Sequence, residues 1–199
     1  MPNGSKTAIV ISSDANYFDL LMGTVRSLRE RAPELDADLC ILDVGLTADQ
    51  VAVLKDMAAS VVTVGWDLDF PGRDRTPGYF KAMVSRPYLP NHFPGYETYM
   101  WIDSDAWVQD ASVISLFLAA AADGSLAIVP EIDRGYVAHY KRPRAYWRRP
   151  SHRMYRWAYG WKVADRLGRN PILNSGAFAL RGDAPHWRLW QTALKTALC

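Results

Sequence analysis

The segment TYMWIDSD, residues 98–105, joins a short run of aromatic and apolar residues to two acidic residues. Its first five residues favour a buried β-strand, because large apolar and aromatic side chains pack well on a sheet. Asp103 and Asp105 follow that strand at once. In open α/β sheets, ligands bind outside the carboxyl ends of the strands. We therefore expect both carboxylates to lie in a binding crevice of an α/β protein.

The sequence before this segment alternates predicted strands with predicted helices. Short apolar runs indicate strands, and apolar residues that recur every three or four positions indicate amphipathic helices. Strands and helices are predicted in turn over residues 8–11, 17–31, 38–42, 47–59 and 61–64. Thr47 and Gln50 can close a capping box at the start of the second helix. This alternation predicts a parallel sheet covered by helices.

The rest of the chain continues the pattern with longer interruptions. Residues 65–78 are rich in Asp, Arg, Pro and Gly, which predicts an exposed loop. A helix is expected over residues 80–89, bent or ended by Pro87 because a proline removes a helix hydrogen bond. The remaining predicted elements are helices at 112–122 and 187–198 and strands at 126–129 and 176–180.

Composition and charge predict one soluble globular domain over residues 1–199. Hydrophobic residues make up 49% of the chain and charged residues 22%, with a net charge of +2. These values argue against a disordered acidic chain and against a protein that binds polyanions over its whole surface. The two cysteines give no disulfide framework, and the apolar run at 8–11 is too short for a signal peptide or a membrane span. We expect a cytoplasmic protein.

Asp103 and Asp105 have the spacing of two residues that share one metal ion. In extended backbone, residues two apart project to the same side, and hard cations such as Mg²⁺ or Mn²⁺ prefer carboxylate oxygens. The alternative is a loop in which both carboxylates only accept hydrogen bonds from nearby backbone amides. Phosphatases of the haloacid dehalogenase type also have an Asp-x-Asp motif, but on the first strand and continuing to Thr or Val where this chain has Trp107. The sequence therefore fits the phosphatase motif less well than it fits a metal site at the end of a later strand.

Segments spread over nearly the whole chain resemble glycosyltransferase family 8, the retaining galactosyl- and glucosyltransferases of the GT-A fold that include glycogenin. The matching segments, in the family's order, are SSDANY (12–17), ILDVGLT (41–47), residues 79–90 with Arg86, IDSD (102–105) and LNSGAF (173–178). The resemblance implies an α/β GT-A fold with a mainly parallel sheet flanked by helices. It also implies a transferase that moves a sugar from a nucleotide diphosphate sugar, expected to be a UDP-sugar, to a hydroxyl acceptor on a carbohydrate, a lipid-linked molecule or a protein.

The resemblance also implies roles for individual residues. Asp103 and Asp105 would bind Mn²⁺ or Mg²⁺, which stabilises the charge of the departing diphosphate. The residues expected to hold the nucleoside, the phosphates and the donor sugar are Ser12, Asp14, Asn16, Tyr17, Arg86, Ser104, Asn174, Ser175 and Gly176. The candidate catalytic residues are Arg86 and Asp133. Glu131 and Asp133 follow the fifth strand, where a carboxylate could hold a sugar hydroxyl or act as a base, or could simply be solvated.

Several of these residues have an ordinary structural interpretation as well. Asp14 and Asn16 could cap the first helix, and Tyr17 could pack on the core beside the helix start. Arg86 could form a surface ion pair, and residues 174–176 could be a turn into the sixth strand. The sequence leaves each pair of interpretations open.

The family carries further site residues that this sequence does not show. They are an Asp-Gln pair beside the reacting sugar and a late His, followed by Gly and Lys, that completes the metal and diphosphate site. The histidines of this chain, His92, His139, His152 and His186, lack that context, so no third protein ligand is predicted. We expect residues 1–130 to form the nucleotide-sugar-binding half and residues 131–199 an acceptor-side region whose C-terminal part is missing. A non-catalytic binding protein of the same fold is the alternative.

Residues 134–169 hold eleven of the 23 basic residues, interleaved with tyrosines and tryptophans. Aromatic faces stack on sugar rings, so this region is expected to shape the acceptor site. Its charge also suits an anionic membrane surface, which would place the protein peripherally at the inner face of the membrane. The same composition is typical of RNA-binding segments. A third interpretation is an amphipathic helix pair with aromatic residues in the core and solvated arginines.

Overall fold

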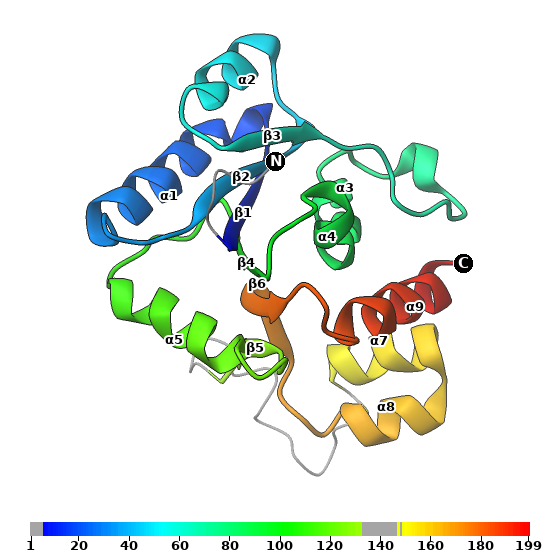
Figure 1. Cartoon of the computed structure of the whole chain (residues 1–199). Helices are drawn as coiled ribbons and strands as arrows, with labels where there is room; N and C mark the ends of the chain where they lie inside the picture. Colours follow the sequence, from blue (N-terminus) through cyan, green and yellow to red (C-terminus); the bar gives the residue numbers. More distant parts are fainter. Residues whose placement is uncertain (1–5, 133–146, 148) are drawn as a thin grey trace.

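The computed structural model, which describes residues 6–132, 147 and 149–199, contains a twisted sheet with helices on both faces (Figure 1). The central strand, β1 (Thr7–Asp14), is buried along nearly its whole length. It runs parallel to β2 (Asp38–Gly45) on one side and to β4 (Thr98–Ile102) on the other. Strand β3 (Ser60–Thr63) pairs in parallel with β2 at the edge. These four strands confirm the predicted parallel sheet.

The other half of the sheet contains one reversed strand. The strand order is β3-β2-β1-β4-β6-β5, and β6 (Leu173–Arg181) runs antiparallel to both β4 and β5 (Ala127–Pro130). Ile102 at the end of β4 therefore pairs with Ala177 near the start of β6. Because of this reversal, the residues just before Ala177 lie beside the residues just after Ile102.

Alternate residues of the strands build a core on each face of the sheet. Val10 packs on the face covered by α3 (Phe80–Ser85), α4 (Leu89–His92) and α9 (His186–Leu198). Its neighbour Ile11 packs on the opposite face, which α1 (Phe18–Arg31), α2 (Ala48–Lys55) and α5 (Ala111–Ala121) cover (Figure 1). The period of two along a strand sends neighbouring side chains to opposite faces.

Proline and capping residues set the helix boundaries near the carboxyl ends of the strands. Pro87 ends regular helix as predicted, since α3 stops at Ser85 and a 3₁₀ turn, η3 (Arg86–Tyr88), leads into α4. The capping box of Thr47 and Gln50 is formed, but its helix ends at Lys55, earlier than predicted. A second 3₁₀ turn, η1 (Ala15–Tyr17), precedes α1. The predicted loop at 65–78 contains one further turn, η2 (Arg73–Arg75).

The helices α7 (Pro150–Tyr159) and α8 (Trp161–Leu167) form a pair joined at Gly160, whose positive φ of 82° suits glycine. The Tyr159 hydroxyl donates to the Ala193 carbonyl of α9 at 3.1 Å, which fixes the pair beside that helix. The predicted helix pair is therefore present in the described part of this region, but the expectation that its aromatic residues lie in the core is wrong for Trp157 and Trp161, which are exposed. Among the residues that the structure describes, no helix combines the length and apolarity needed to cross a bilayer.

Candidate functional site

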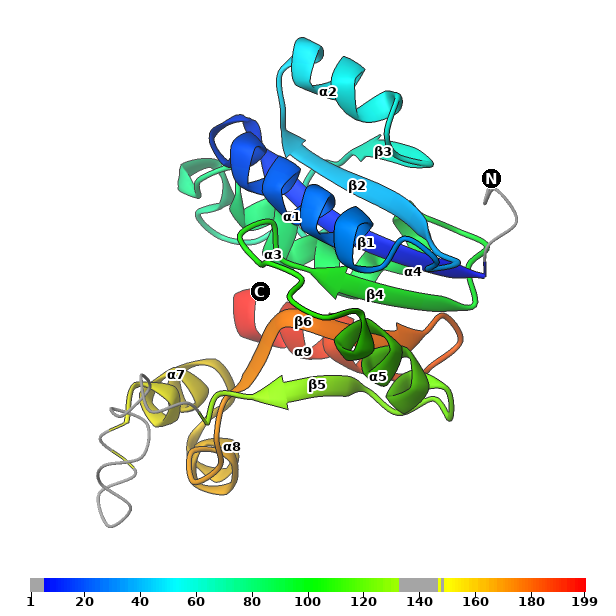
Figure 2. The same ribbon diagram turned by 90° about the vertical axis from the view of Figure 1, so that its left-hand side faces the viewer.

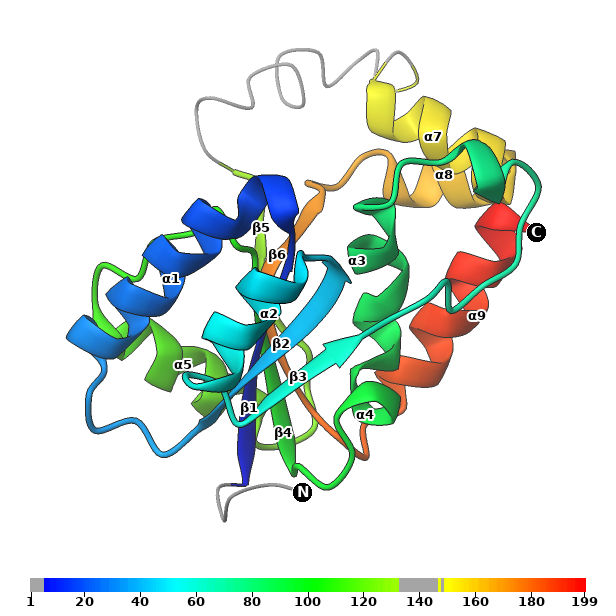
Figure 3. The ribbon, with the colours of Figure 1, turned by 90° about the horizontal axis from the view of Figure 1, so that it is seen from above.

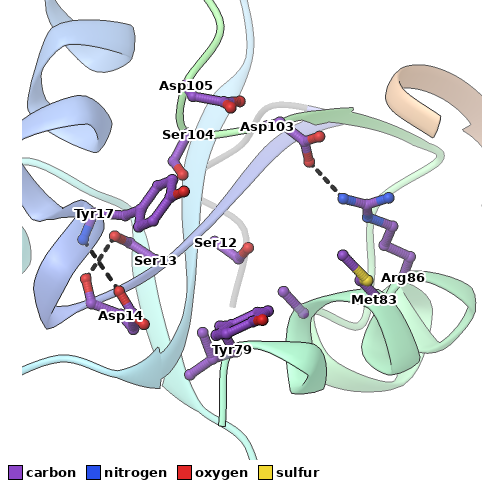
Figure 4. A pocket seen from close by; sticks show the side chains of 12 residues that line it. Ser12, Ser13, Asp14, Tyr17, Tyr79, Met83, Arg86, Asp103, Ser104 and Asp105 are labelled. Atoms are coloured by element: carbon purple, nitrogen blue, oxygen red, sulfur yellow. Dashed lines mark hydrogen bonds and ion pairs between the residues drawn. The ribbon is translucent and has the colours of Figure 1, made fainter. Parts of the chain in front are cut away.

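A cleft of about 250 Å³ opens at the carboxyl ends of β1, β2 and β4 (Figure 4). Its walls come from the ends of β1 and β2, the turn η1, helix α3 with the turn η3, and the segment after β4. The lining residues are Ser12, Ser13, Asp14, Tyr17, Val44, Tyr79, Ala82, Met83, Arg86, Asp103, Ser104 and Asp105. The cleft thus lies where the sequence predicted it, and both acidic residues of the Asp-x-Asp motif face it.

Asp103 is held at the cleft through one of its two carboxylate oxygens. Arg86 Nη2 lies 2.6 Å from Asp103 Oδ1, and Trp101 Nε1 donates to the same oxygen at 2.7 Å. The Arg86 guanidinium also lies over the Trp101 ring, 4.9 Å from its centroid, in a cation–π contact. These contacts fix the carboxylate and leave Asp103 Oδ2 for another partner.

Arg86 links the Asp-x-Asp segment to the start of β6. Its Nη1 donates to Ser175 Oγ at 2.7 Å, while Nη2 is used by Asp103. The Arg86 side chain is only 11% exposed, and burial lowers its pKa, an effect that the charge of Asp103 opposes. A buried charge needs an ion-pair or hydrogen-bond partner. Here Asp103 lines the cleft itself, and Ser175 contacts the cleft residue Arg86. Arg86 does form an ion pair, but the expectation of a surface pair is wrong, because the pair lies inside the cleft and Arg86 is largely buried.

Asp105 is exposed at the cleft and forms no hydrogen bond or ion pair with any residue in the described ranges. The Asp103 side chain keeps 34% of its surface exposed. The alternative that both carboxylates serve only to cap backbone amides is therefore wrong for this segment. Two hard carboxylate oxygens in one cleft fit a Mg²⁺ or Mn²⁺ ion whose other positions are filled by phosphate oxygens and water. No group of three or more metal-ligating side chains occurs among the described residues.

Helix α1 supports the backbone that carries Asp105. The fully buried Thr24 hydroxyl lies 2.7 Å from the carbonyl oxygens of both Ser104 and Ala106. A buried hydroxyl in this position anchors the segment on either side of Asp105.

The segment after β1 provides a capped turn and one aromatic wall. Asp14 Oδ1 accepts hydrogen bonds from the backbone N–H groups of Asn16 and Tyr17 at 3.0 and 3.1 Å, so its capping role is confirmed. Asn16 is exposed and is not one of the lining residues, whereas Ser12 is. Tyr17 faces the cleft with 49% of its surface exposed and does not pack in the core.

The residues at the start of β6 approach the Asp-x-Asp segment closely. The Asp103 N–H donates to the Gly176 carbonyl at 2.7 Å, and Gly176 N–H donates to Asn174 Oδ1 at 2.8 Å. A Cβ atom added at Gly176 would lie 2.8 Å from Asp103 Oδ2 and 2.9 Å from Asn174 Oδ1. Glycine is needed here for space. Asn174, Ser175 and Gly176 lie behind Arg86 and Asp103 and do not themselves line the cleft.

Tyr79 and Met83 line the cleft but were not predicted as site residues from the sequence. Tyr79 is 49% exposed and faces the cleft from the start of α3, while Tyr17 faces it from η1 (Figure 4). Residues 79, 83 and 86 follow helical spacing, so the position of Arg86 could have identified the other two. Asp133 lies outside the described residues. Glu131 is described, and it is not part of the cleft lining.

A family model described as glycosyl transferase family 8 matches residues 8–180. No curated protein sequence matches the chain. Three solved structures illustrate the fold similarity. The galactosyltransferase LgtC, in complex with donor and acceptor sugar analogues, is 15% identical with a TM-score of 0.60, covering 94% of this chain and 61% of that chain.

Two further structures give the same result. The apo bifunctional glycosyltransferase WbbM is 15% identical with a TM-score of 0.62, covering 98% of this chain and 35% of that chain. The mannosyltransferase Ktr4p from S. cerevisiae is 10% identical with a TM-score of 0.59, covering 97% and 61%. The chain thus spans at most 61% of the length of these three structures. At these identities the similarity shows a shared GT-A fold.

Proposed function

The chain belongs to glycosyl transferase family 8, and from this we propose that it transfers a glycosyl unit from a UDP-sugar to a hydroxyl acceptor, with a divalent cation held by Asp103 and Asp105. One observation carries the proposal. Asp103 and Asp105 share a cleft at the carboxyl end of β4, with Asp103 fixed by Arg86 and Asp105 left without a protein partner in the described ranges. An ordered carboxylate beside an unpaired one suits a cation that arrives with its substrate.

The nucleoside end of the donor is assigned to the outer part of the cleft. Tyr17 and Tyr79 offer two aromatic faces, on which a flat base can stack. Asp14 uses only Oδ1 in its capping bonds, so Oδ2 is available to accept a hydrogen bond from the base or ribose. The hydroxyls of Ser12 and Ser104 supply further polar groups at the same wall. Asn16 does not line the cleft, so we assign it a nucleoside contact only at the edge of the cleft.

The diphosphate end is assigned to the Asp-x-Asp segment. Mn²⁺ or Mg²⁺, when bound there, would neutralise charge on the departing diphosphate. Asp105 is the proposed principal ligand, and Asp103 would contribute Oδ2, since Oδ1 is used by Arg86 and Trp101. Each Nη atom of Arg86 keeps a second N–H after bonding Asp103 and Ser175, and we assign these protons to donor oxygens.

In the proposed reaction the bond between the sugar C1 and the diphosphate oxygen breaks, and a bond between C1 and the acceptor oxygen forms. We propose retention of the anomeric configuration, with the acceptor proton passing to an oxygen of the leaving diphosphate. Arg86 contributes by keeping Asp103 and Ser175 in one geometry, because a small misplacement of site groups slows a reaction strongly. Asp133 remains a proposed residue that binds a sugar hydroxyl or acts as a general base. We assign Asn174, Ser175 and Gly176 to the donor-sugar side of the site.

Calorimetric titration of UDP, with Mn²⁺ present or removed by a chelator, tests the proposal. UDP should bind at least about tenfold more tightly with Mn²⁺, as one metal bridge predicts. Asp105→Asn should abolish this difference, whereas the matched control Asp49→Asn, at an exposed acid on α2, should keep it. Equal UDP affinity of the native chain and of Asp105→Asn in the presence of Mn²⁺ would contradict the metal assignment. Hydrolysis of a UDP-sugar over hours then separates an enzyme from a non-catalytic binding protein.

A further inference from the structure

The helix pair α7 and α8 carries an exposed apolar stripe. Trp157 is 79% exposed, Trp161 is 59% exposed and Met154 is 53% exposed. Met154 and Trp157 are three positions apart on α7, which places them along one side of that helix. Trp161 begins α8 after the turn at Gly160, and its ring meets the His152 ring edge to face with the centroids 5.8 Å apart while the rest of it stays exposed. A soluble surface rarely exposes grouped large apolar side chains unless they contact a partner.

The opposite side of the pair is anchored to the protein. Ser151 and His152 are buried, His152 Nε2 lies 3.0 Å from Asp165 Oδ1, and the Tyr159 hydroxyl bonds α9. Turning the tryptophans inward would break these contacts. The apolar stripe is therefore held outward by the packing of the helices.

Positive charge surrounds the stripe. Residues 149–169 contain six basic side chains and one acidic one, Asp165, which is paired with His152. Arg153, Lys162 and Arg166 are exposed and form no ion pair with any residue in the ranges that the structure describes. Arg156 lies over the Trp161 ring at 4.7 Å, so cation and aromatic group share the same surface.

We propose that the outward face of α7 and α8 docks on an anionic lipid bilayer. Tryptophan prefers the boundary between headgroups and acyl chains, and arginine beside it binds lipid phosphates. A hollow on α7 is lined by Pro150, Arg153, Met154, Arg156 and Trp157, so two arginines share it with three apolar residues. That combination matches a phosphate headgroup joined to an acyl chain.

The position of this face suits a transferase that works at a membrane. Figures 2 and 3 show α7 and α8 on the side of the molecule toward which β4 points, and the donor cleft opens at that end of β4. A bilayer on this face would bring a lipid-linked hydroxyl acceptor to the same side as the cleft. Docking itself does not depend on the proposed donor chemistry.

Flotation with lipid vesicles tests the proposal on the full chain. The chain should float with vesicles of phosphatidylcholine and phosphatidylglycerol and remain behind with phosphatidylcholine alone. The double substitution Arg153→Gln and Arg156→Gln should weaken binding to the anionic vesicles by roughly 30-fold, since each basic residue near the surface contributes about fivefold. Trp157→Ala with Trp161→Ala should also release the chain from vesicles, and this loss should persist at high salt.

Matched variants on the far face provide the controls. Arg26→Gln with Arg31→Gln, both on α1, and Leu116→Ala on α5 change charge and exposed apolar surface elsewhere and should leave flotation unchanged. UDP affinity, measured on every variant, should not change, which separates docking from nucleotide binding. Equal flotation of the tryptophan variants and the native chain would overturn the proposal. So would retention of single-stranded RNA on a filter by a chain that ignores anionic vesicles.

Discussion

Arg86 binds one oxygen of Asp103 and leaves the other, Oδ2, beside Gly176. The pair joins the first residue of the turn η3, just after helix α3, to the residue that follows strand β4, 17 positions apart in the chain. It orders the first carboxylate of the motif before any ligand arrives. Ordered ligands lower the cost of binding, because less freedom is lost when the ligand enters.

Replacing Arg86 should therefore damage the site more than the fold. Arg86→Lys removes the planar fork that bonds Asp103 and Ser175 together, so transferase activity should fall by about 100-fold or more. The free energy of unfolding should fall by only about 1–2 kcal/mol, because Asp103 is one-third exposed and partly solvated when it loses its partner. Turnover of a UDP-sugar and urea denaturation measure the two effects. A loss of stability with full activity would contradict the positioning role.

Gly176→Ala should weaken metal-dependent UDP binding. The new methyl group would lie 2.8 Å from Asp103 Oδ2, so either the carboxylate or the strand must shift. The expected loss of stability is about 1–3 kcal/mol, as for other overpacked sites. Gly65→Ala is the control, since no atom lies within 4 Å of the added carbon there. Thermal unfolding and UDP titration with Mn²⁺ should separate the two variants; identical behaviour would show that the close approach does not matter.

Tyr17 and Tyr79 should each contribute to nucleotide affinity by stacking. Tyr17→Ala and Tyr79→Ala should each weaken UDP binding by about 5- to 100-fold, because base stacking on an aromatic ring contributes about 1–3 kcal/mol. Tyr17→Phe and Tyr79→Phe keep the ring and should bind UDP like the native chain. A full loss of affinity in the phenylalanine variants would instead assign the role to the hydroxyl groups. Titration of GDP beside UDP shows which base the cleft prefers.

Thr24→Val should loosen the segment that carries Asp105. The valine fills the same space but removes the hydroxyl that lies 2.7 Å from the Ser104 and Ala106 carbonyls. Unsatisfied buried carbonyls should cost about 1–3 kcal/mol of stability. Mn²⁺-dependent UDP binding should weaken as well, whereas Thr24→Ser should retain both. Hydrogen exchange of the backbone amides in residues 104–106 reports the loosening directly.

The two cysteines should differ in reactivity. Burial raises the pKa of Cys40 to about 11, so its thiol stays protonated and enclosed at neutral pH, while Cys199 is exposed. A maleimide at pH 7.5 should label Cys199 alone, and Cys199→Ser should take up no label until it is unfolded. The thiol of the unfolded chain ionises near pH 9, so the contribution of Cys40 to stability is complete below pH 9 and is lost between about 9 and 11. In Cys40→Ala this part of the alkaline loss should disappear.

The sequence by itself determined the strand and helix alternation and the place of Asp103 and Asp105 at the end of a buried strand. These features depend on local periodicity, on Pro87 and on capping residues, all of which act within a few positions. The sequence also indicated Arg86 and residues 174–176, but only through a family resemblance.

Only the tertiary structure decided which of these residues touch. The reversed strand β6 brings Ser175 and Gly176 to Arg86 and Asp103 across a long stretch of chain, and no local pattern predicts that pairing. The same holds for Tyr79, which faces the cleft because α3 packs over the sheet, and for Trp157, which faces outward because the opposite side of α7 is buried. Periodicity gives each element an apolar face, but the burial of all faces together decides which side chains stay exposed.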